Sequence, residues 1–337
     1  MIKKDLLKYT GNINQYAGIT TFIYNDGKGK GIEAYRVKTG TTLDFTVLKD
    51  RSFDIFEASY KGINLMYMTR NGLVNPYYYY PVEDGFGATM TGGLLFTCGL
   101  KNVGGGVRDI NGYYHFTHGR NHVMPSVNSY AKALWEGDNY KFELGGYVPD
   151  TLFGGSSLVL FRNIISAMDS KEIVINDSVE NQNSCEEEFM LLYHFNFGYP
   201  FIDEDAEIII NSPAKVKPFD DFSKEQLKNR LKFAPPNDHF PDCNYLHDIE
   251  SDENGFVTVK IENKKHGFGV YIKFKKDTLP YCNIWKSVAT GRYTLSVQPS
   301  NCQLLNRVKE RENGTLKKIS SFDQVKHKVI LGIYDLE

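Results

Sequence analysis

Three of the eight histidines in this chain lie close together in the segment YYHFTHGRNH, as His115, His118 and His122. Imidazole nitrogens bind metal ions and also hydrogen-bond small polar ligands. On a strand, His115 and His118 would point to opposite faces because their separation is odd, whereas His118 and Arg120 would share a face. The spacing leaves three interpretations open: a metal site, a substrate-binding pair formed by His118 and Arg120, or a solvated polar edge. We favour the substrate-binding pair and expect neither a bound metal nor a cofactor.

Other segments with residues suited to chemistry carry weaker patterns. The glycine run 104–106 lacks the spacing of a phosphate-binding loop, and no helical pattern follows it, so we predict a turn. His194, in LLYHFNFGYP, ends a strongly apolar run, where a lone histidine is typically a hydrogen-bonded core residue. The sequence has no GxSxG elbow and no recognisable Cys–His signature, so acyl transfer has no support.

The elements that must position these residues are mainly strands. Apolar and polar residues alternate with a period of two in many segments that are bounded by Gly, Asn and Asp, which is typical of an antiparallel β-sandwich or barrel. The predicted strands are Thr42–Leu48, Ser157–Ile165, Lys171–Val179, Glu187–Phe195, Ala206–Asn211, Gly255–Glu262, Gly267–Lys275, Arg292–Val297 and Lys328–Tyr334. We therefore predict an all-β fold with a few short helices, in a single domain over residues 1–337.

Helical pattern is scarce. It is clearest over Ser223–Phe233, where Ser223 and Gln226 fit a capping box. Regular helices do not alternate with the strands, which argues against a βαβ nucleotide-binding fold. Asn71–Lys101 and Phe233–Asp248 are predicted to be long irregular segments, ordered by their aromatic residues and close to the site.

Composition excludes several classes of partner. Of the 337 residues, 39 are Lys or Arg and 41 are Asp or Glu, so the net charge of −2 argues against a nucleic-acid or polybasic membrane partner. No apolar run is long enough to cross a membrane. The five cysteines are scattered without a CxxC pair, which predicts a cytoplasmic protein with reduced, mostly buried thiols. The 22 Phe and 22 Tyr fit both strand cores and sugar-stacking surfaces.

Six blocks, in this order, resemble the aldose 1-epimerase (galactose mutarotase-like) superfamily, and in particular a bacterial branch whose members mostly carry no assigned activity. The blocks are DRSFDI at Asp50–Ile55, GGLLFTCGL at Gly92–Leu100, HGR at His118–Arg120, YHFNFGYPFID at Tyr193–Asp203, LPYCNIWK at Leu279–Lys286 and GRYTLSVQPSNC at Gly291–Cys302. The resemblance spans most of the chain and implies a large antiparallel β-sandwich that binds sugar on a concave sheet face.

The resemblance also implies roles for individual residues. His118 matches the histidine that helps to hold the sugar ring. His194, with Asn196 beside it, is similar to the histidine that donates a proton to the ring oxygen. A glutamate before a proline near the C-terminus would remove the proton of the anomeric hydroxyl, so that ring opening and reclosure exchange the α and β anomers. An acid and a base on opposite sides of one ring suit such proton transfers near neutral pH.

The sequence departs from this pattern at the position of the base, which is Gln298. A glutamine amide cannot take up a proton to a useful extent, and loss of a general base costs a factor of roughly 10² to 10⁴ in rate. Either another carboxylate, such as Asp242 or Asp203, replaces it, or the protein binds sugar without this chemistry. The arginine that precedes the first histidine in mutarotases also has no counterpart at that spacing, and Arg51 or Arg120 would have to supply the cation.

The sequence therefore predicts an aldose mutarotase-like protein, with a catalytically silent carbohydrate-binding protein as the alternative. A third interpretation is another sugar-active enzyme on the same scaffold. Arg51, Arg120 and Lys286 lie in the matching blocks, so the sugar could carry a phosphate or carboxylate. Trp285 would stack on the ring. We expect a small-molecule sugar as the partner, no nucleic acid or membrane, and a monomer or homodimer.

Overall fold

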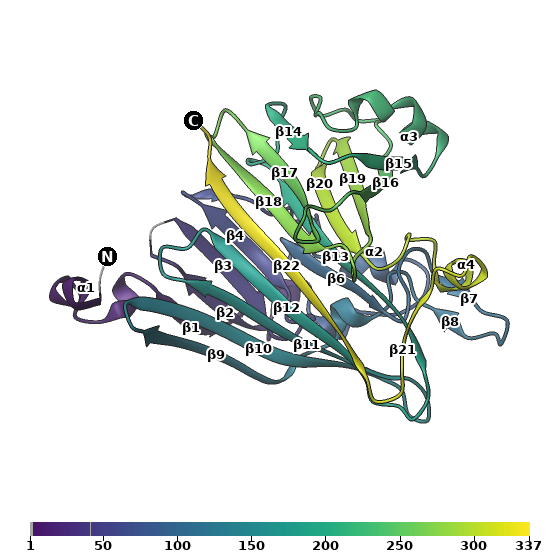
Figure 1. Cartoon of the computed structure of the whole chain (residues 1–337), viewed down its shortest axis with the longest axis horizontal. Coiled ribbons are helices and arrows are strands. Elements are labelled where there is room, and N and C mark those ends of the chain that lie inside the picture. The colour runs from purple at the N-terminus through teal and green to yellow at the C-terminus, as the bar shows by residue number, and fades with distance from the viewer. Residues whose placement is uncertain (1–2, 41) are drawn as a thin grey trace.

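The computed structural model describes residues 3–40 and 42–337. Two large antiparallel sheets and a smaller one make up most of the chain (Figure 1). All nine predicted strand segments coincide with strands, and the all-β prediction is confirmed.

The eight-stranded sheet has the strand order β14-β17-β18-β22-β12-β11-β10-β9. Its strands are β9 (Val127–Glu136), β10 (Asn139–Thr151), β11 (Ser157–Ala167), β12 (Glu172–Asn181), β14 (Ala206–Ile209), β17 (Phe256–Asn263), β18 (Phe268–Lys275) and β22 (Gln324–Asp335). Burial alternates along most of them, so one face points to the core and the other faces outward.

The seven-stranded sheet has the order β15-β16-β19-β20-β13-β21, and β6 also pairs with β13. Its strands are β6 (Leu95–Leu100), β13 (Glu187–Gly198), β15 (Ala214–Pro218), β16 (Cys243–Ile249), β19 (Tyr281–Ala289), β20 (Arg292–Ser300) and β21 (Lys317–Ile319). In the eight-stranded sheet, one face of most strands points outward. In the seven-stranded sheet, β6 and the second half of β13 are buried on both faces. Other parts of the chain therefore cover both faces of the sheet at these two strands.

The smaller elements complete the fold. The five-stranded sheet contains β1 (Gly18–Ile23), β2 (Glu33–Lys38), β3 (Leu43–Leu48), β4 (Ile55–Tyr60) and β5 (Ile63–Asn64), and a hairpin contains β7 (Val107–Arg108) and β8 (Tyr114–His115). The α-helices are α1 (Lys3–Tyr9), α2 (Gly85–Thr89), α3 (Asp221–Glu225) and α4 (Arg307–Glu312). The 3-10 helices are η1 (Ile13–Gln15), η2 (Gly27–Gly29), η3 (Pro76–Tyr78), η4 (Asn121–Val123) and η5 (Leu227–Asn229). No helix within the described residues is long and apolar enough to span a membrane.

The main core lies between the sheets and is built from their inward-facing aliphatic and aromatic side chains. A second, smaller apolar cluster covers the other face of β6 and β13 and includes Phe96, Met190 and Leu192. The cysteines in the described chain are unpaired, and only Cys185 is exposed.

The observed helix α3 (Asp221–Glu225) is shorter than the helix predicted over Ser223–Phe233 and starts two residues before it. Asp220 caps α3 by accepting from the Ser223 backbone N–H, and Ser223 lies inside the helix. The Ser223 hydroxyl instead accepts from the backbone N–H of Asn244 at 3.0 Å. Asp220 supplies a carboxylate at the N-cap and leaves the serine free to hold a neighbouring strand, so the capping-box assignment was wrong.

The two segments predicted to be irregular each contain a strand. Asn71–Lys101 includes β6, and Phe233–Asp248 includes most of β16. The strand β6 is buried along its whole length, so apolar residues do not alternate with polar ones and the period-two signal is missing.

Candidate functional site

A cavity of about 220 Å³ lies on the face of the seven-stranded sheet that points away from the main core. Half of its lining residues come from strands and half from loops and the short helix α2. The lining residues are Phe86, Met90, His118, His194, Asn244, Trp285, Gln298 and Leu304.

Strand register brings the four strand residues onto one face. Asn244 pairs with Trp285 across β16 and β19, and Asn283 pairs with Gln298 across β19 and β20. His194 on β13 lies beside Gln298 on β20, and their side-chain nitrogens are 3.0 Å apart. Side chains alternate between faces along a strand, so residues at these positions converge while Tyr193 and Val297 point into the main core.

A chain of hydrogen bonds sets the protonation of His194. The Gln298 amide nitrogen lies against Nε2 of His194, and because an amide nitrogen only donates, Nε2 accepts. On the other side of the ring, Nδ1–H donates to Ser296 Oγ at 2.9 Å. The Gln298 oxygen accepts from the Asn283 side-chain amide at 2.9 Å, which fixes the orientation of the glutamine. The imidazole in this network is neutral.

Burial keeps both histidines of the cavity uncharged. It lowers the pKa of His194 to about 3, with a smaller contribution from the charge of His118. It lowers the pKa of His118 to about 4. At neutral pH neither ring is an imidazolium, so His194 in the ligand-free protein does not hold the proton that the resemblance assigns to it.

His118 reaches the cavity from a loop that backbone contacts hold in place. Its backbone is in the left-handed region with a φ of 55°, its N–H donates to the Gly104 carbonyl at 2.8 Å, and its carbonyl accepts from Gly99 at 3.0 Å. The Gly104 N–H approaches Nδ1 of the ring at 3.4 Å. The neutral ring therefore carries its proton on Nε2, which makes no hydrogen bond within the described chain and is available to a ligand.

Gly119 explains why this loop lies so close to β6. Its φ is 69°, and a Cβ at this position would lie 2.1 Å from the Gly99 carbonyl oxygen. Only glycine allows the two backbones to approach so closely. The glycine run 104–106 forms the neighbouring loop, in agreement with the predicted turn.

Aromatic rings form the walls of the cavity. The Phe86 ring lies 5.3 Å from the His118 ring, and the Trp285 ring lies 5.8 Å from the His194 ring. Met90 and Leu304 add apolar surface beside them. The cavity thus combines uncharged hydrogen-bonding groups with flat apolar surfaces.

The structure places the three histidines of YYHFTHGRNH in separate environments. His115 Nε2 lies 3.1 Å from Asp109 in the hairpin, and the buried His122 ring stacks on Phe96 at 4.8 Å. Only His118 lines the cavity. The described residues contain no group of three His, Cys, Asp or Glu side chains placed to hold a metal ion.

The structure does not bring Arg120 to the cavity beside His118. Arg120 Nε donates to Asp150 and its Nη2 donates to the Thr151 carbonyl, both at 2.6 Å. The expectation of a shared face assumed a strand, but the segment is a turn with a left-handed residue at His118, so the i, i+2 relation does not apply.

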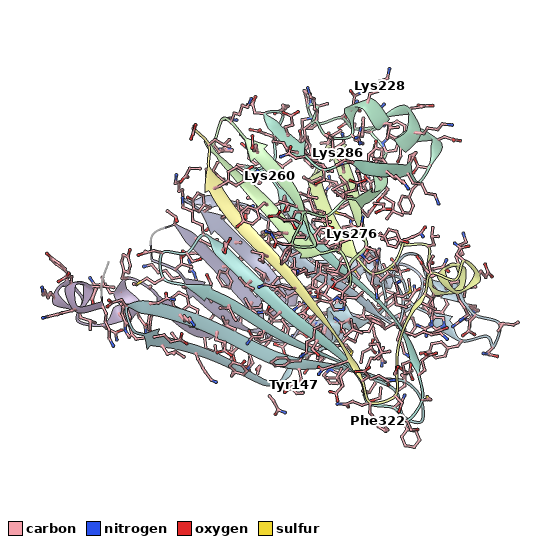
Figure 2. The ribbon with its side chains drawn as sticks, in the orientation of Figure 1. Tyr147, Lys228, Lys260, Lys276, Lys286 and Phe322 are labelled. Carbon is pink, nitrogen blue, oxygen red and sulfur yellow. The ribbon has the colours of Figure 1, made fainter. Side chains whose placement is uncertain are left out.

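Arg51 and Lys286 also point elsewhere. Arg51 is buried and donates to the carbonyls of Val74 at 2.7 Å and Thr89 at 3.3 Å, so it supports the loop that carries α2. Lys286 adjoins Trp285 on β19 and therefore faces the opposite side of the sheet. Figure 2 shows it below Lys228, and its Nζ donates to the carbonyls of Asn229 at 2.7 Å and Lys232 at 2.8 Å.

Asn196, Asp242 and Asp203 lie outside the cavity lining. Asn196 is fully buried and donates to the carbonyls of Gly93 and His194, both at 3.0 Å. Asp242 forms an ion pair with Arg292 at 2.9 Å. Asp203 accepts from Asn263 at 2.7 Å and Lys265 at 2.9 Å. Neither carboxylate is placed to replace the missing glutamate next to His194.

Sequence reasoning missed several residues of the site. Phe86, Met90 and Leu304 come from loops with no periodic pattern, and no signal in the sequence marks them. Asn244 lies in a segment predicted to be irregular. Ser296 could have been found, because it lies in the predicted strand Arg292–Val297 and would share the face of Gln298 if that strand continued by one residue, as β20 does.

The profile of the family described as a domain of unknown function (DUF4432) matches residues 29–333. The chain belongs to this family. None of the curated proteins matches the sequence.

Solved structures share the fold of this DUF4432 chain. A candidate aldose 1-epimerase from Klebsiella pneumoniae has a TM-score of 0.89 at 19% identity, covering 98% of this chain and 86% of its own. A galactose mutarotase-like protein from Clostridium acetobutylicum has a TM-score of 0.65 at 15% identity, covering 96% of this chain and 100% of its own. Galactose 1-epimerase from Lactobacillus acidophilus has a TM-score of 0.59 at 10% identity, with coverage of 95% and 100%. The resemblance to the galactose mutarotase-like fold is confirmed.

Proposed function

We propose that this protein binds the ring of an aldose in the cavity between Trp285 and His118. The observation that supports this most strongly is the set of uncharged donors and acceptors beside flat aromatic surfaces. His118 Nε2–H and the amides of Asn244 and Gln298 suit sugar hydroxyls, and Trp285 and Phe86 suit the apolar face of the ring. The volume of about 220 Å³ corresponds to roughly seven water molecules, which a small ring would displace.

Tryptophan fluorescence offers a direct test, because the chain has only two tryptophans, Trp135 on β9 and Trp285 in the cavity. Titration of the Trp135→Phe protein with a panel of aldoses should change the emission of the remaining Trp285. The matched Trp285→Phe protein should bind the same sugar at least tenfold more weakly by calorimetry. Absence of a calorimetric signal for every aldose in the wild-type protein would contradict the proposal.

Anomer exchange is the second candidate function, favoured by the two histidines that line the cavity next to Gln298. None of the described residues that line the cavity carries a carboxylate, so a base for the anomeric hydroxyl would have to be a neutral imidazole whose pKa burial has lowered to about 3 or 4. Such weak bases transfer protons slowly at neutral pH. We therefore expect the wild-type protein to accelerate mutarotation little or not at all.

The Gln298→Glu variant tests this second function. A carboxylate at this position should raise the rate of anomer exchange, measured by NMR on a sugar that binds, by a factor of roughly 10² or more. Gln182→Glu, an exposed change of the same kind outside the cavity, is the matched control. An unchanged rate in Gln298→Glu, with sugar binding retained, would mean that residue 298 does not occupy the position of the base.

A further inference from the structure

The nitrogen donors of the cavity are largely free. His118, Asn244 and Trp285 line the cavity, and each is half-buried. The neutral His118 ring has one N–H at Nε2, the Asn244 amide has two and the Trp285 indole has one. None of these N–H groups makes a hydrogen bond within the described chain, and the second N–H of the Gln298 amide is also unused there. Four side chains therefore offer N–H groups to a ligand.

The side-chain acceptors of the cavity are already engaged. Asn283 donates its amide to Gln298 Oε1 at 2.9 Å and to Asn244 Oδ1 at 3.3 Å. His194 Nε2 accepts from Gln298, and its Nδ1–H is directed to Ser296. The imidazole acceptor is thus used up, and each amide oxygen has one lone pair left. The buried oxygen of Asn283 has no partner, but Asn283 is not among the described residues that line the cavity.

Backbone carbonyls on the loop side of the cavity also have partners. The Phe86 carbonyl accepts from the Met90 N–H at 2.9 Å. The Met90 carbonyl accepts from the Thr69 hydroxyl at 2.6 Å and the Asn71 amide at 2.9 Å. The His118 carbonyl accepts from a backbone N–H of β6 at 3.0 Å. What this side adds to the cavity is therefore mainly apolar surface.

This excess of donors discriminates between ligand groups. A hydroxyl that accepts from a free N–H also carries a hydrogen of its own, and burying that hydrogen without an acceptor costs free energy. A carbonyl oxygen accepts two hydrogen bonds and has no hydrogen to place. A carboxylate also accepts, but its charge would be buried beside neutral histidines, with no cation among the described lining residues. A neutral carbonyl on the sugar ring fits these donors best.

We infer that the cavity takes a sugar whose ring carries a neutral carbonyl in place of a hydroxyl, namely an aldonolactone, the lactone of an aldose. This inference rests on the proposed sugar binding and narrows its substrate class. A ring ketone would also present an acceptor, but ketones add water and then carry two hydroxyls, whereas a lactone carbonyl does not. Trp285 and Phe86 can pack on the lactone ring as they would on the aldose ring.

Matched ligands test the preference in the full-length protein. For glucose and for galactose, the aldose would be compared with its 1,5-lactone, with the 1,5-anhydro sugar that lacks the anomeric hydroxyl, and with the open-chain aldonate that hydrolysis of the lactone produces. Stopped-flow fluorescence of Trp285 in the Trp135→Phe protein measures binding within seconds, before the lactone hydrolyses. We expect at least one lactone to bind about tenfold or more tightly than its aldose, with the anhydro sugar between them and the aldonate weakest.

Two isosteric variants assign the preference to the cavity lining. Asn244→Asp replaces the free amide N–H groups by an acceptor, and Gln298→Glu adds a carboxylate on the same face of the sheet. Each should reduce the ratio of lactone to aldose affinity about tenfold, because a hydroxyl of the aldose then finds an acceptor. Asn254→Asp and Gln182→Glu, exposed changes of the same kind outside the cavity, should leave the ratio unchanged. Urea denaturation checks that each variant is folded before its ratio is compared.

The possible outcomes are distinguishable. Aldoses or aldonates that bind as tightly as the lactones, or a preference that survives both variants, would overturn the inference and leave the proposed sugar binding standing. A lactone that binds where no aldose does would support the inference and overturn aldose binding. Failure of every ligand to bind, by fluorescence and by calorimetry, would overturn both.

Discussion

Tyr193 and His194 are neighbours on β13, yet they belong to two buried polar clusters of opposite character. On the face of β13 that points to the main core, called the inner face, the Tyr193 hydroxyl donates to Asp177 at 2.8 Å. Arg162 forms ion pairs with both Asp177 and Asp54 there. On the opposite, outer face, which carries the cavity, His194 belongs to a network of neutral amides and hydroxyls. One cluster is made of paired charges, and the other of groups that carry none.

The two clusters also differ in how completely they are satisfied. The charged atoms of Arg162, Asp54 and Asp177 contact one another or hydrogen-bond neighbouring groups. On the outer face, the side-chain oxygens of Asn196 and Asn283 are buried without a hydrogen-bond partner in the described chain. Complete pairing is typical of a cluster that stabilises the fold, whereas unpaired polar atoms beside a cavity are typical of a ligand site.

The largest expected effect comes from breaking the inner cluster. Arg162→Leu leaves two carboxylates buried without a cation, which should lower the free energy of unfolding by about 3–5 kcal/mol. Urea denaturation measures this, with Arg36→Leu as an exposed control expected to change stability by less than about 0.5 kcal/mol. A loss below about 1 kcal/mol for Arg162→Leu would show that the charges are not needed for stability.

The pH dependence of stability should have opposite signs at the two clusters. Burial raises the pKa of Asp54 from 3.8 to about 6, so the folded protein holds a proton that the unfolded chain has lost. The contribution of Asp54 is therefore fully present below about pH 4 and is lost as the pH rises through about 6, an effect on the order of 2 kcal/mol. Asp54→Asn should remove it, as seen in the difference between variant and wild-type unfolding curves from pH 4 to 7.

His194 should contribute to the pH dependence of unfolding with the opposite sign, and the same unfolding curves measure it. Burial lowers its pKa from 6.5 to about 3, so its contribution is present above about pH 6.5 and is lost as the pH falls toward 3. His194→Gln should make the protein less sensitive to acid in this range. If both variants changed the pH profile in the same direction, the contrast between the faces would be wrong.

Gln298→Glu would convert the neutral cluster into a charged one. A carboxylate against Nε2 should raise the pKa of His194 by about 1–3 units, because an opposite charge favours the imidazolium. Histidine NMR across a pH titration reports this shift, and Gln182→Glu should leave the His194 signal where it is. A His194 pKa that stays near 3 would place the new carboxylate away from the ring.

The smallest effect is expected at Ser296, which contacts the Nδ1 side of the His194 ring. Ser296→Ala removes the acceptor of Nδ1–H and should cost about 0.5–1.5 kcal/mol in sugar affinity by calorimetry. Ser300→Ala on the same strand is the control, since that hydroxyl donates to the Cys302 carbonyl. Equal losses in the two variants would indicate a general effect on the strand.

The sequence predicts the strands best where one face is solvated, because polar and apolar residues then alternate, as in β12 and β17. It fails at β6, where both faces are buried. Within the site, His118, His194, Trp285 and Gln298 could be named from motif blocks. The arginines could not be placed, because the direction of a side chain in a turn depends on backbone angles that the spacing of residues does not reveal.

The cavity draws its polar groups from the sheet, apart from His118, and its apolar walls mostly from loops and the short helix α2. His194, Asn244 and Gln298 are held by the ladder of the seven-stranded sheet, whereas Phe86 projects from the short helix α2 and Met90 and Leu304 project from loops. Loops accept substitutions, insertions and deletions more readily than the strands they join. A laboratory could therefore graft new wall residues onto the 76–90 and 301–306 segments and retune which sugar fits, while the hydrogen-bonding floor stays intact.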